Sequence, residues 1–426
     1  MSKIFFLLLC IAEGFLLTSN IDKADVYLSP VLILLTGIGI GLCVIYKSFD
    51  NGQQTTEIGQ RQSKIENLFS IGIFIYGFIQ IKNQLTDVFK IYAVDKSISD
   101  IIPQIQIILH YFLSGKTPYV TFNDLGYPMF PCYLPAQWLP FVLAEKYQFD
   151  YRWISSSVLC IGIAVLCSIM WQSRLKFYEK AGVVFFIFFF LSRFITLQDV
   201  VFGATIETLM SGYYILLAVG IYRTKNLPLR AGLITLCLLS RFSFLFWVPL
   251  YIGIVALSES YRNAFKLSLY IFLGVFLFYI LPFMIIPNDY TIFFKTQQYY
   301  TEATVGEWQH LSDNGEVPRH LFNGKGLACY FYMYVKGDLL HKIHIAQFAA
   351  WCANFLAAAT LFFFFLKKKN ETNARIYAVG ALKIIITVFY AFVQIPYSYL
   401  FLVPLGLTQV MLFVFNGNYL QHSEKN

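Results

Sequence analysis

Charged residues are scarce in this sequence. Asp, Glu, Lys and Arg make up 13% of its 426 residues, whereas about a quarter of a soluble domain is charged. Hydrophobic residues make up 58%, and apolar runs of about 20 residues recur, each long enough to cross a hydrocarbon core of ~30 Å. This composition excludes a soluble domain. Because the runs are too long and continuous for barrel strands, the sequence predicts an all-α polytopic membrane protein.

Motifs of several soluble functions are also missing. No Walker motif is found, so we expect no nucleotide hydrolysis. The eight cysteines form no CxxC pair and no metal-ligand spacing, and most lie in apolar runs, where cysteine is a packing residue. The net charge of +8 is explained by Lys and Arg that orient membrane helices, and we expect no nucleic-acid partner.

The apolar runs predict about 12 transmembrane helices, together with amphipathic helices on the outer face. We interpret the first run as a span rather than a cleaved signal peptide, because Glu13 interrupts it and no clear cleavage site follows. The runs 231–240 and 243–257 are either one long helix or two helices that break near Arg241. The predicted spans lie near 4–19, 27–46, 68–86, 153–171, 181–196, 204–222, 231–240, 243–257, 267–286, 346–366, 376–391 and 397–416.

Basic residues in the short loops predict the orientation of the chain. Alternating spans put every basic cluster on one side, the cytoplasm, together with both chain ends, provided that residues 131–147 do not cross the membrane. We therefore expect YLPAQWLPFVLAEKY to lie on the membrane surface, with its Trp and Tyr side chains at the interface. The clusters are Lys47, Arg61 and Lys64; Arg174, Lys176 and Lys180; Arg223, Lys225 and Arg230; Arg262 and Lys266; and Lys367, Lys368, Lys369 and Arg375.

Two long segments remain on the outer face, and loops of this length usually carry function. They divide the chain into four parts. These are two spans and a cytoplasmic loop (1–67), a core with the first outer loop at 87–152 (68–286), the second outer loop (287–345), and three spans with a tail (346–426).

The first outer loop contains Asp100 directly before a helical pattern, IIPQIQIILHYFL, which Gly115 ends. Asp100 is either a helix cap or a functional acid. Tyr119, Tyr127 and Tyr133 follow among prolines. Their rings either stack on sugars or populate the membrane interface.

The order of these features resembles the GT-C superfamily of integral-membrane glycosyltransferases, which use polyprenyl-phosphate sugars and include mannosyltransferases and arabinosyltransferases. The resemblance covers roughly residues 68–286. The chain departs from the family where an acidic pair is often found, since it has Gly203-Ala204-Thr205 followed by Glu207, and its first two spans have no counterpart. The matching residues are Asp100, Gly115-Lys116-Thr117-Pro118-Tyr119, Tyr133-Leu134-Pro135, Arg152, Ser192-Arg193 through Asp199, and RAGLITLCLLSRFSFLFWVPLYIG.

The resemblance implies an inverting transfer of a sugar from a polyprenyl-phosphate donor to a lipid-linked or glycan acceptor on the outer face of the membrane. We then expect the protein in a bacterial inner membrane, with its active face toward the periplasm or the cell exterior. In the family, an acid of the first outer loop takes the proton of the acceptor hydroxyl. This nominates Asp100 as the general base and Asp95 as the second choice, a role worth roughly 10²–10⁴-fold in rate.

The leaving phosphate needs positive charge, and sugars need polar and aromatic side chains. The sequence does not decide whether a divalent metal serves as a cofactor, and it predicts no metal ligand. Arg241, Lys383 and Glu13 lie inside apolar runs, where a charge usually faces a cavity or a partner. Arg241 either meets a lipid phosphate or pairs within the protein. The predicted donor-phosphate ligands are Arg319, Lys325, Arg193 and Arg152, and the predicted acceptor and sugar ligands are Tyr119, Asp124, Tyr127, Tyr133, Asp199, Glu307, Trp308 and His310.

Three other interpretations stay open. A lipid-linked-sugar transporter or flippase would explain many spans and buried charges, but not two long loops on one side, and no inverted symmetry is evident. A polysaccharide polymerase would have a basic outer loop, expected late in the chain. A non-catalytic scaffold would leave the acids at the span ends without a role.

Overall fold

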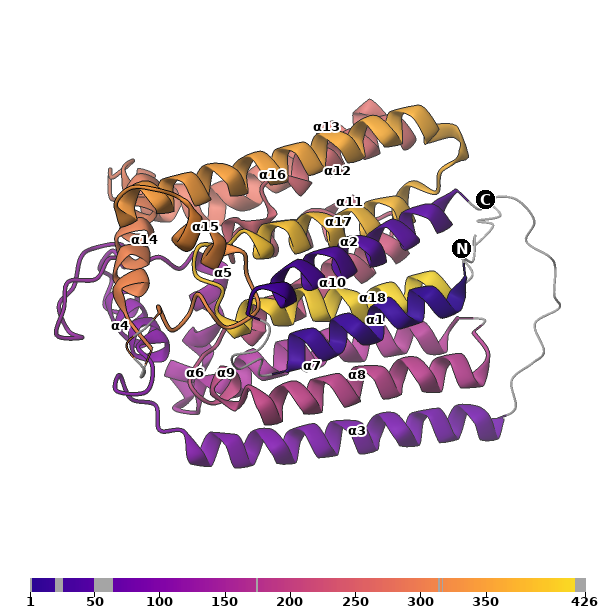
Figure 1. Ribbon diagram of the computed structural model, residues 1–426, viewed down its shortest axis with the longest axis horizontal. Coiled ribbons are helices and arrows are strands. Elements are labelled where there is room, and N and C mark those ends of the chain that lie inside the picture. The colour runs from indigo at the N-terminus through magenta and orange to yellow at the C-terminus, as the bar shows by residue number, and fades with distance from the viewer. Residues whose placement is uncertain are drawn as a thin grey trace.

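The computed structural model describes residues 2–19, 26–49, 64–173, 175–312, 315 and 317–417, with the backbone alone for 64–70. In these residues the regular structure is helical (Figure 1), apart from two isolated β-bridges in loops. The predicted all-α class is confirmed. Of the predicted orientation clusters, Arg61, Arg174 and the side chain of Lys64 lie outside the described residues.

Seven helices of the described chain are long and apolar enough to cross a membrane. They are α2 (Leu28–Ser48), α7 (Tyr151–Trp171), α8 (Phe177–Leu197), α13 (Tyr261–Val275) with its continuation η3 (Phe276–Ile285), α16 (Leu339–Lys368) with η4 (Lys369–Glu371), α17 (Ala374–Ala391), and η5 (Ser398–Phe401) with α18 (Leu402–Asn416).

The other predicted spans are helical too, but each of these helices is either too short or not apolar enough to count among the candidate membrane-spanning helices. α11 and α12 have 12 residues each, so each is about 18 Å long and covers little more than half of a hydrocarbon core of ~30 Å. These helices are α1 (Lys3–Thr18), α3 (Lys64–Ile91), α10 (Thr208–Arg223), α11 (Leu227–Leu238) and α12 (Trp247–Ser258).

The long helices run side by side, and the two ends of the bundle differ (Figure 1). At one end, Lys3 Nζ lies 3.0 Å from Glu179 Oε1, and the Asn373 amide donates to Ser48 O at 2.8 Å. These contacts join the start of α1 to α8 and the end of α2 to α17. The predicted cytoplasmic residues Lys47 and Lys176 lie at this end. Both long loops gather at the other end, which we call the outer end.

α11 and α12 form a hairpin of half height. Arg230, near the start of α11, lies 2.8 Å from Glu259, just after the end of α12, so the chain reverses between the two helices. The reversal contains η2 (Phe242–Phe244) and Arg241, whose backbone is extended. Of the two alternatives, the chain therefore forms two helices with a break near Arg241, which lies at the tip of the hairpin.

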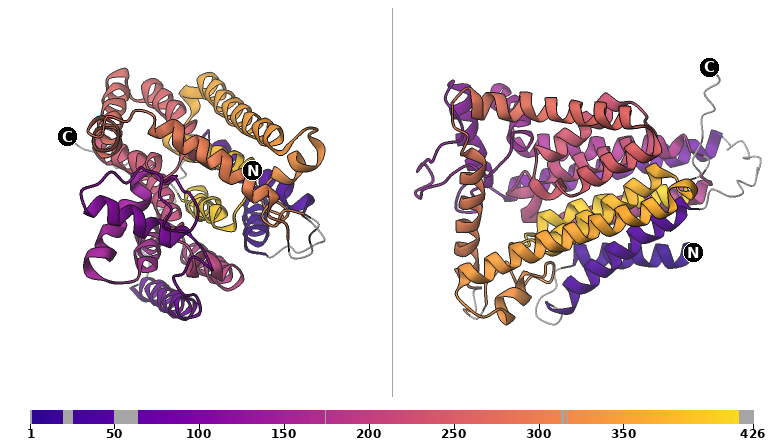
Figure 2. Two further views of the ribbon diagram at one scale, coloured as in Figure 1. Left: turned by 90° about the vertical axis from the view of Figure 1, so that its left-hand side faces the viewer. Right: turned by 90° about the horizontal axis from the view of Figure 1, so that it is seen from above.

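Short helices cover this hairpin at the outer end, and α14 crosses the end of the bundle (Figure 2). The Ala136 amide donates to Leu239 O at 2.9 Å, which holds α5 on the tip. Trp138 is fully buried and donates to the Tyr119 hydroxyl at 3.3 Å. The Trp138 side chain therefore packs against protein, because the short hairpin leaves room that α5 fills, and the expected surface position of this segment stays a prediction. The outer elements are α4 (Ile101–Leu113), α5 (Pro135–Trp138), η1 (Leu139–Phe141), α6 (Val142–Tyr147), α9 (Asp199–Gly203), α14 (Ile292–Gln309) and α15 (Ala328–Tyr334).

A buried ion pair joins three helices inside the bundle. Lys383 Nζ of α17 lies 2.6 Å from Glu13 Oε1 of α1, and both side chains are fully buried. Lys383 also donates to Pro404 O at 3.0 Å, and the Thr408 hydroxyl of α18 donates to Glu13 Oε2. The two charges that the sequence places in apolar runs thus neutralise each other.

Candidate active site

Asp100 precedes α4 but does not cap it. Its carboxylate makes no hydrogen bond to the first turn of the helix, and instead Oδ2 accepts a hydrogen bond of 2.6 Å from the Tyr127 hydroxyl. A tight turn with Gly126 in the left-handed region brings Tyr127 back to the start of α4. Burial and then this carboxylate raise the pKa of Tyr127, so the phenol stays protonated as the donor. The Asp100 side chain is therefore free of a capping role.

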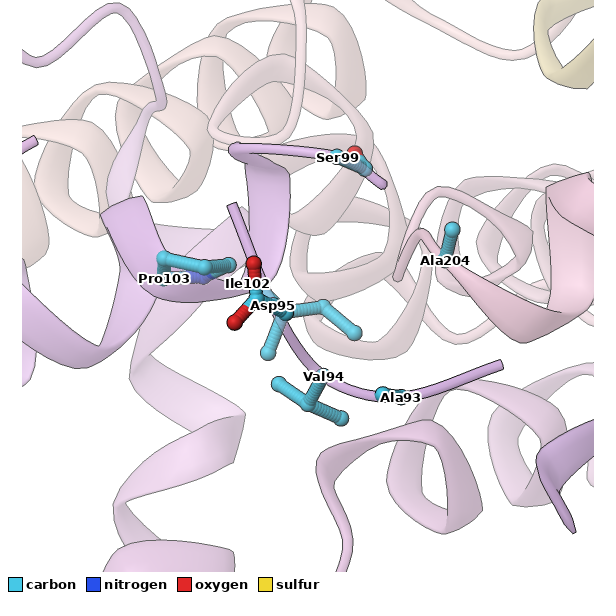
Figure 3. A pocket seen from close by; sticks show the side chains of 7 residues that line it. All are labelled: Ala93, Val94, Asp95, Ser99, Ile102, Pro103 and Ala204. Carbon is cyan, nitrogen blue, oxygen red and sulfur yellow. The ribbon is translucent and has the colours of Figure 1, made fainter. Parts of the chain in front are cut away.

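Asp95, the second choice for the base, has a different environment. Its carboxylate accepts a hydrogen bond of 2.7 Å from the Ser97 amide, which holds the pKa of Asp95 below its usual value. The side chain lies exposed in a shallow surface hollow (Figure 3). A lowered pKa makes the Asp95 carboxylate a weaker proton acceptor than an ordinary aspartate. The hollow is lined by Ala93, Val94, Asp95, Ser99, Ile102, Pro103 and Ala204.

A second charged group lies at the tip of the α11–α12 hairpin. Arg241 Nη1 lies 3.6 Å from Glu207 Oε2, the carboxylate directly before α10. Glu207 is fully buried, whereas 22% of the Arg241 side chain is exposed. The Gln137 amide of α5 donates to Glu207 Oε2. At 3.6 Å the ion pair is longer than a hydrogen bond, so the guanidinium keeps donors for a ligand.

Tyrosines from three separate elements surround this pair. Tyr133 comes from the segment before α5, Tyr300 from α14 and Tyr399 from η5, and each lies close enough to Arg241 or Glu207 to interact electrostatically. Tyr133 and Tyr300 are partly exposed. We call Arg241, Glu207, Gln137, Tyr133, Tyr300 and Tyr399 the Arg241 cluster.

Cys132 connects Asp100 to the Arg241 cluster. Its thiol lies 3.9 Å from Gln104 Oε1, whose backbone amide donates to Asp100 O at 2.8 Å, and the next residue, Tyr133, belongs to the Arg241 cluster. Burial raises the pKa of Cys132 to about 12, which keeps the thiol neutral. The structure thus gathers a carboxylate, a guanidinium with free donors and several phenols at the outer end of the bundle.

Arg152, a predicted phosphate ligand, uses all its donors within the protein. Nε and Nη2 bond the Asp150 carboxylate, the latter at 2.5 Å. Nη1 donates to Tyr92 O at 2.8 Å and to Gly203 O at 2.7 Å, and Nη2 also donates to Phe89 O at 3.1 Å. Five N–H groups are the full capacity of a guanidinium. Arg152 therefore holds the outer loop to α3 and α9 and has no donor left for a phosphate.

We expect Arg152→Lys to lower the free energy of unfolding by about 2–3 kcal/mol, because an ammonium has three donors and cannot reproduce the planar fork. Thermal unfolding in detergent, followed by tryptophan fluorescence, measures the loss. Arg193→Lys is the matched control, since Arg193 has fewer partners. Equal melting temperatures for the two variants would contradict this role.

Arg193 and Arg319, two further predicted phosphate ligands, make no hydrogen bond or ion pair with the Arg241 cluster in the described chain. Arg193 Nε donates to the Thr18 hydroxyl at 3.1 Å, and the guanidinium lies 5.3 Å from the centre of the Phe15 ring. Arg319 is exposed on the second outer loop. Arg193 thus contacts α1, and Arg319 stays available at the surface.

Lys325 supports the cluster from behind. Its ammonium is buried, donates to the Ser398 hydroxyl at 2.9 Å and lies over the Phe194 ring at 5.8 Å. Burial lowers the pKa of Lys325 to about 7. Because Ser398 precedes Tyr399 of the Arg241 cluster, Lys325 fixes the chain that presents this phenol rather than facing a ligand itself.

The predicted sugar ligands divide into buried and accessible residues. Tyr119 and Trp308 are buried, and their polar atoms donate to Tyr133 O at 2.9 Å and Gln394 O at 3.0 Å. Asp199 bonds its neighbouring Val200 amide at 2.9 Å. Tyr127, Asp124 and His310 are exposed, and Tyr133 and Glu307 are partly exposed. The accessible residues remain candidates for sugar contacts.

Glu307 belongs to a polar group beside the Arg241 cluster. His320 Nε2 lies 3.7 Å from the Glu307 carboxylate, and the His320 ring packs on Tyr397 with centroids 5.0 Å apart. Tyr397 in turn stacks on Tyr399 at 5.2 Å. Burial lowers the pKa of His320. A carboxylate next to stacked rings is a typical arrangement for contacting a sugar.

Several residues of the Arg241 cluster were absent from the predicted ligands. Glu207 and Arg241 carry a signal, because charges inside apolar runs need a partner or a cavity. No such sequence signal marks Gln137, Tyr300 and Tyr399, since their roles depend on contacts between distant segments.

Comparison of the chain with protein-family models, with curated proteins and with solved structures finds no match. Within the described ranges, no group of three or more His, Cys, Asp and Glu side chains is arranged to hold a metal ion.

Proposed function

We propose that this protein is a membrane glycosyltransferase that moves a sugar from a polyprenyl-phosphate donor to a lipid-linked or glycan acceptor. The observation that carries the proposal is that one loop links a carboxylate to a cation at the outer end of the bundle. The Cys132 thiol lies 3.9 Å from Gln104 Oε1, in the first turn after Asp100, and the next residue, Tyr133, belongs to the Arg241 cluster. A general base and a phosphate-binding cation are the two groups that such a transfer needs. Tyr397, which is partly exposed and stacks on the buried Tyr399, adds a ring that can contact a sugar.

In the proposed reaction, the acceptor hydroxyl gives its proton to Asp100 as its oxygen forms a bond to the anomeric carbon. The bond between that carbon and the phosphate oxygen breaks, and its electron pair stays on the phosphate. The phosphodiester monoanion becomes a phosphate monoester with greater negative charge, which the Arg241 guanidinium stabilises. Attack from the face opposite the phosphate inverts the anomeric configuration.

The proposal includes about twelve helices in a bacterial inner membrane, with both chain ends in the cytoplasm and the outer end facing the periplasm. The seven long apolar helices support the membrane environment. The half-height hairpin supports a site below the outer surface, since Arg241 lies in the reversal between the end of α11 and the start of α12. A lipid-borne phosphate would enter at that depth.

A transporter of lipid-linked sugars is the second candidate. One observation favours it: the α11–α12 hairpin interrupts a span and ends in a charged residue, as broken helices do at transporter binding sites. A transporter would not explain the two long outer loops.

The two candidates differ in whether the sugar–phosphate bond breaks. We expect the purified protein in liposomes with polyprenyl-phosphate sugars and cell extract to release free polyprenyl phosphate and a glycosylated acceptor, followed by mass spectrometry. Liposomes without protein are the control. Movement of intact donor between leaflets without bond cleavage would instead support the transporter.

A further inference from the structure

Glu207 has fewer partners than a buried carboxylate requires. Gln137 Nε2 donates to its Oε2, and Arg241 Nη1 lies 3.6 Å from the same oxygen. Its other oxygen, Oε1, is buried without a hydrogen-bond partner. An ionised carboxylate in such a place depends on the single cation beside it.

Gln137 also has a buried side-chain acceptor that lacks a hydrogen bond. Its side-chain oxygen, Oε1, is also buried without a partner. The planar groups of Gln137 and Glu207 thus share one hydrogen bond while each leaves an acceptor unmatched. A proton on Glu207 Oε1 would supply the missing donor, and a neutral carboxylic acid and an amide would then form a doubly hydrogen-bonded pair.

Whether Glu207 must carry a proton depends on how many negative charges the Arg241 guanidinium has to balance. Without a ligand, the guanidinium balances one ionised carboxylate. A phosphate bound to Arg241 brings a second negative charge to the same cation, and an uncompensated buried charge is costly. An ionised Glu207 therefore opposes phosphate binding, and a neutral Glu207 permits it.

The Tyr133 phenol also lies within hydrogen-bonding reach of the Glu207 carboxylate, yet Glu207 Oε1 still has no hydrogen-bond partner. Arg241 is the cation that acts on the Glu207 carboxylate within the described chain. The remaining groups are phenols and a thiol, which are neutral near pH 7. They are Tyr133, Tyr390, Tyr399 and Cys132.

We propose that Arg241 and Glu207 form a proton-linked binding site for a phosphate group, in which the guanidinium takes the phosphate when Glu207 carries a proton that is donated to Gln137. The inference rests on one element of the proposed function, the phosphate at Arg241, and does not require sugar transfer. The phosphate is that of a lipid headgroup or of a soluble phosphodiester.

Calorimetry on the full-length protein in lipid nanodiscs tests the linkage without any substitution. The first probe is dibutyl phosphate, a soluble diester whose own charge is constant near neutral pH. Titrations in two buffers of different ionisation enthalpy give the number of protons taken up on binding. We expect about one proton per diester at about pH 8, and an affinity that falls up to about tenfold per pH unit. Diester binding without proton uptake would overturn the inference.

Two substitutions assign the linkage to residues. Glu207→Gln keeps the shape and a donor toward Gln137, so it should bind the diester without pH dependence and about tenfold or more tighter than the wild type at about pH 8. Arg241→Gln should lose binding at every pH. Glu259→Gln is the matched control, because it removes a carboxylate from an arginine pair at the opposite end, and it should bind like the wild type. A wild-type pH dependence in Glu207→Gln would refute the role of Glu207.

The source of the phosphate is decided by a second probe, polyprenyl phosphate sugar inserted in the nanodisc. Binding of the lipid form alone indicates a headgroup site, and equal binding of both indicates a site open to soluble diesters. Proton-linked binding without transfer would leave this inference standing and remove the proposed enzyme. Sugar transfer without proton uptake on binding would support the proposed enzyme and overturn this inference.

Discussion

Asp100→Asn is expected to lower the rate of sugar transfer by about 10²–10⁴-fold, the usual contribution of a general base. The carboxamide has nearly the shape of the carboxylate and still accepts the hydrogen bond from Tyr127, which measures 2.6 Å in the native protein. It cannot take the proton of the acceptor hydroxyl. The measurement is the rate of product formation in membranes with matched expression, followed by mass spectrometry.

Asp95→Asn is the matched control for this variant, because Asp95 lies in the same loop and its carboxylate is held by the Ser97 amide at 2.7 Å. We expect its rate to stay within a few-fold of the wild type, a difference well below 1.4 kcal/mol in barrier. If Asp95→Asn alone lost the product, the base would be Asp95. If both variants formed product normally, the first outer loop would not supply the base, and the second outer loop would become the place to search.

Lys383→Met is expected to destabilise the protein by about 3–5 kcal/mol, since it leaves Glu13 buried without its cation. Lys383 Nζ lies 2.6 Å from Glu13 Oε1, and neither side chain is exposed. Thermal unfolding in detergent, with size-exclusion chromatography before and after heating, measures the effect. Lys225→Met, at an exposed position, should melt like the wild type.

The double variant Glu13→Leu with Lys383→Met separates the pair from its parts. Replacing both charges by apolar side chains removes the uncompensated charge, so most of the lost stability should return. A double variant as unstable as the sum of the single variants would show that the two residues act independently. Normal melting of Lys383→Met itself would mean that Glu13 does not need this cation.

The fold was predictable where apolar runs are long. The boundaries of α7 and α17 differ from the predicted spans by about two residues, which is the usual uncertainty of helix ends. The segment around Trp138 was not predictable, because its amphipathic pattern also suits a surface helix. Packing on the short α11–α12 hairpin decides its burial.

The sequence marks part of the candidate site, although it did not predict Glu207 or Arg241 as ligands. Asp100 follows a span and precedes a helix, a local signal, and Arg241 interrupts an apolar run. Arg152 also matched a motif, yet its five donors meet three backbone carbonyls and a carboxylate. Motif order does not reveal whether an arginine is already saturated.

By itself, the sequence determined the helical class, the long apolar helices, the two outer loops and the presence of unpaired charges in apolar runs, because hydropathy and charge act locally along the chain. Tertiary structure alone decided the partners: Glu13 with Lys383, Glu207 with Arg241 and Gln137. These pairs join segments separated by 34 to 370 residues. Their pairing depends on helix packing, because a buried charge or amide is stabilised by whichever distant group the fold brings within reach.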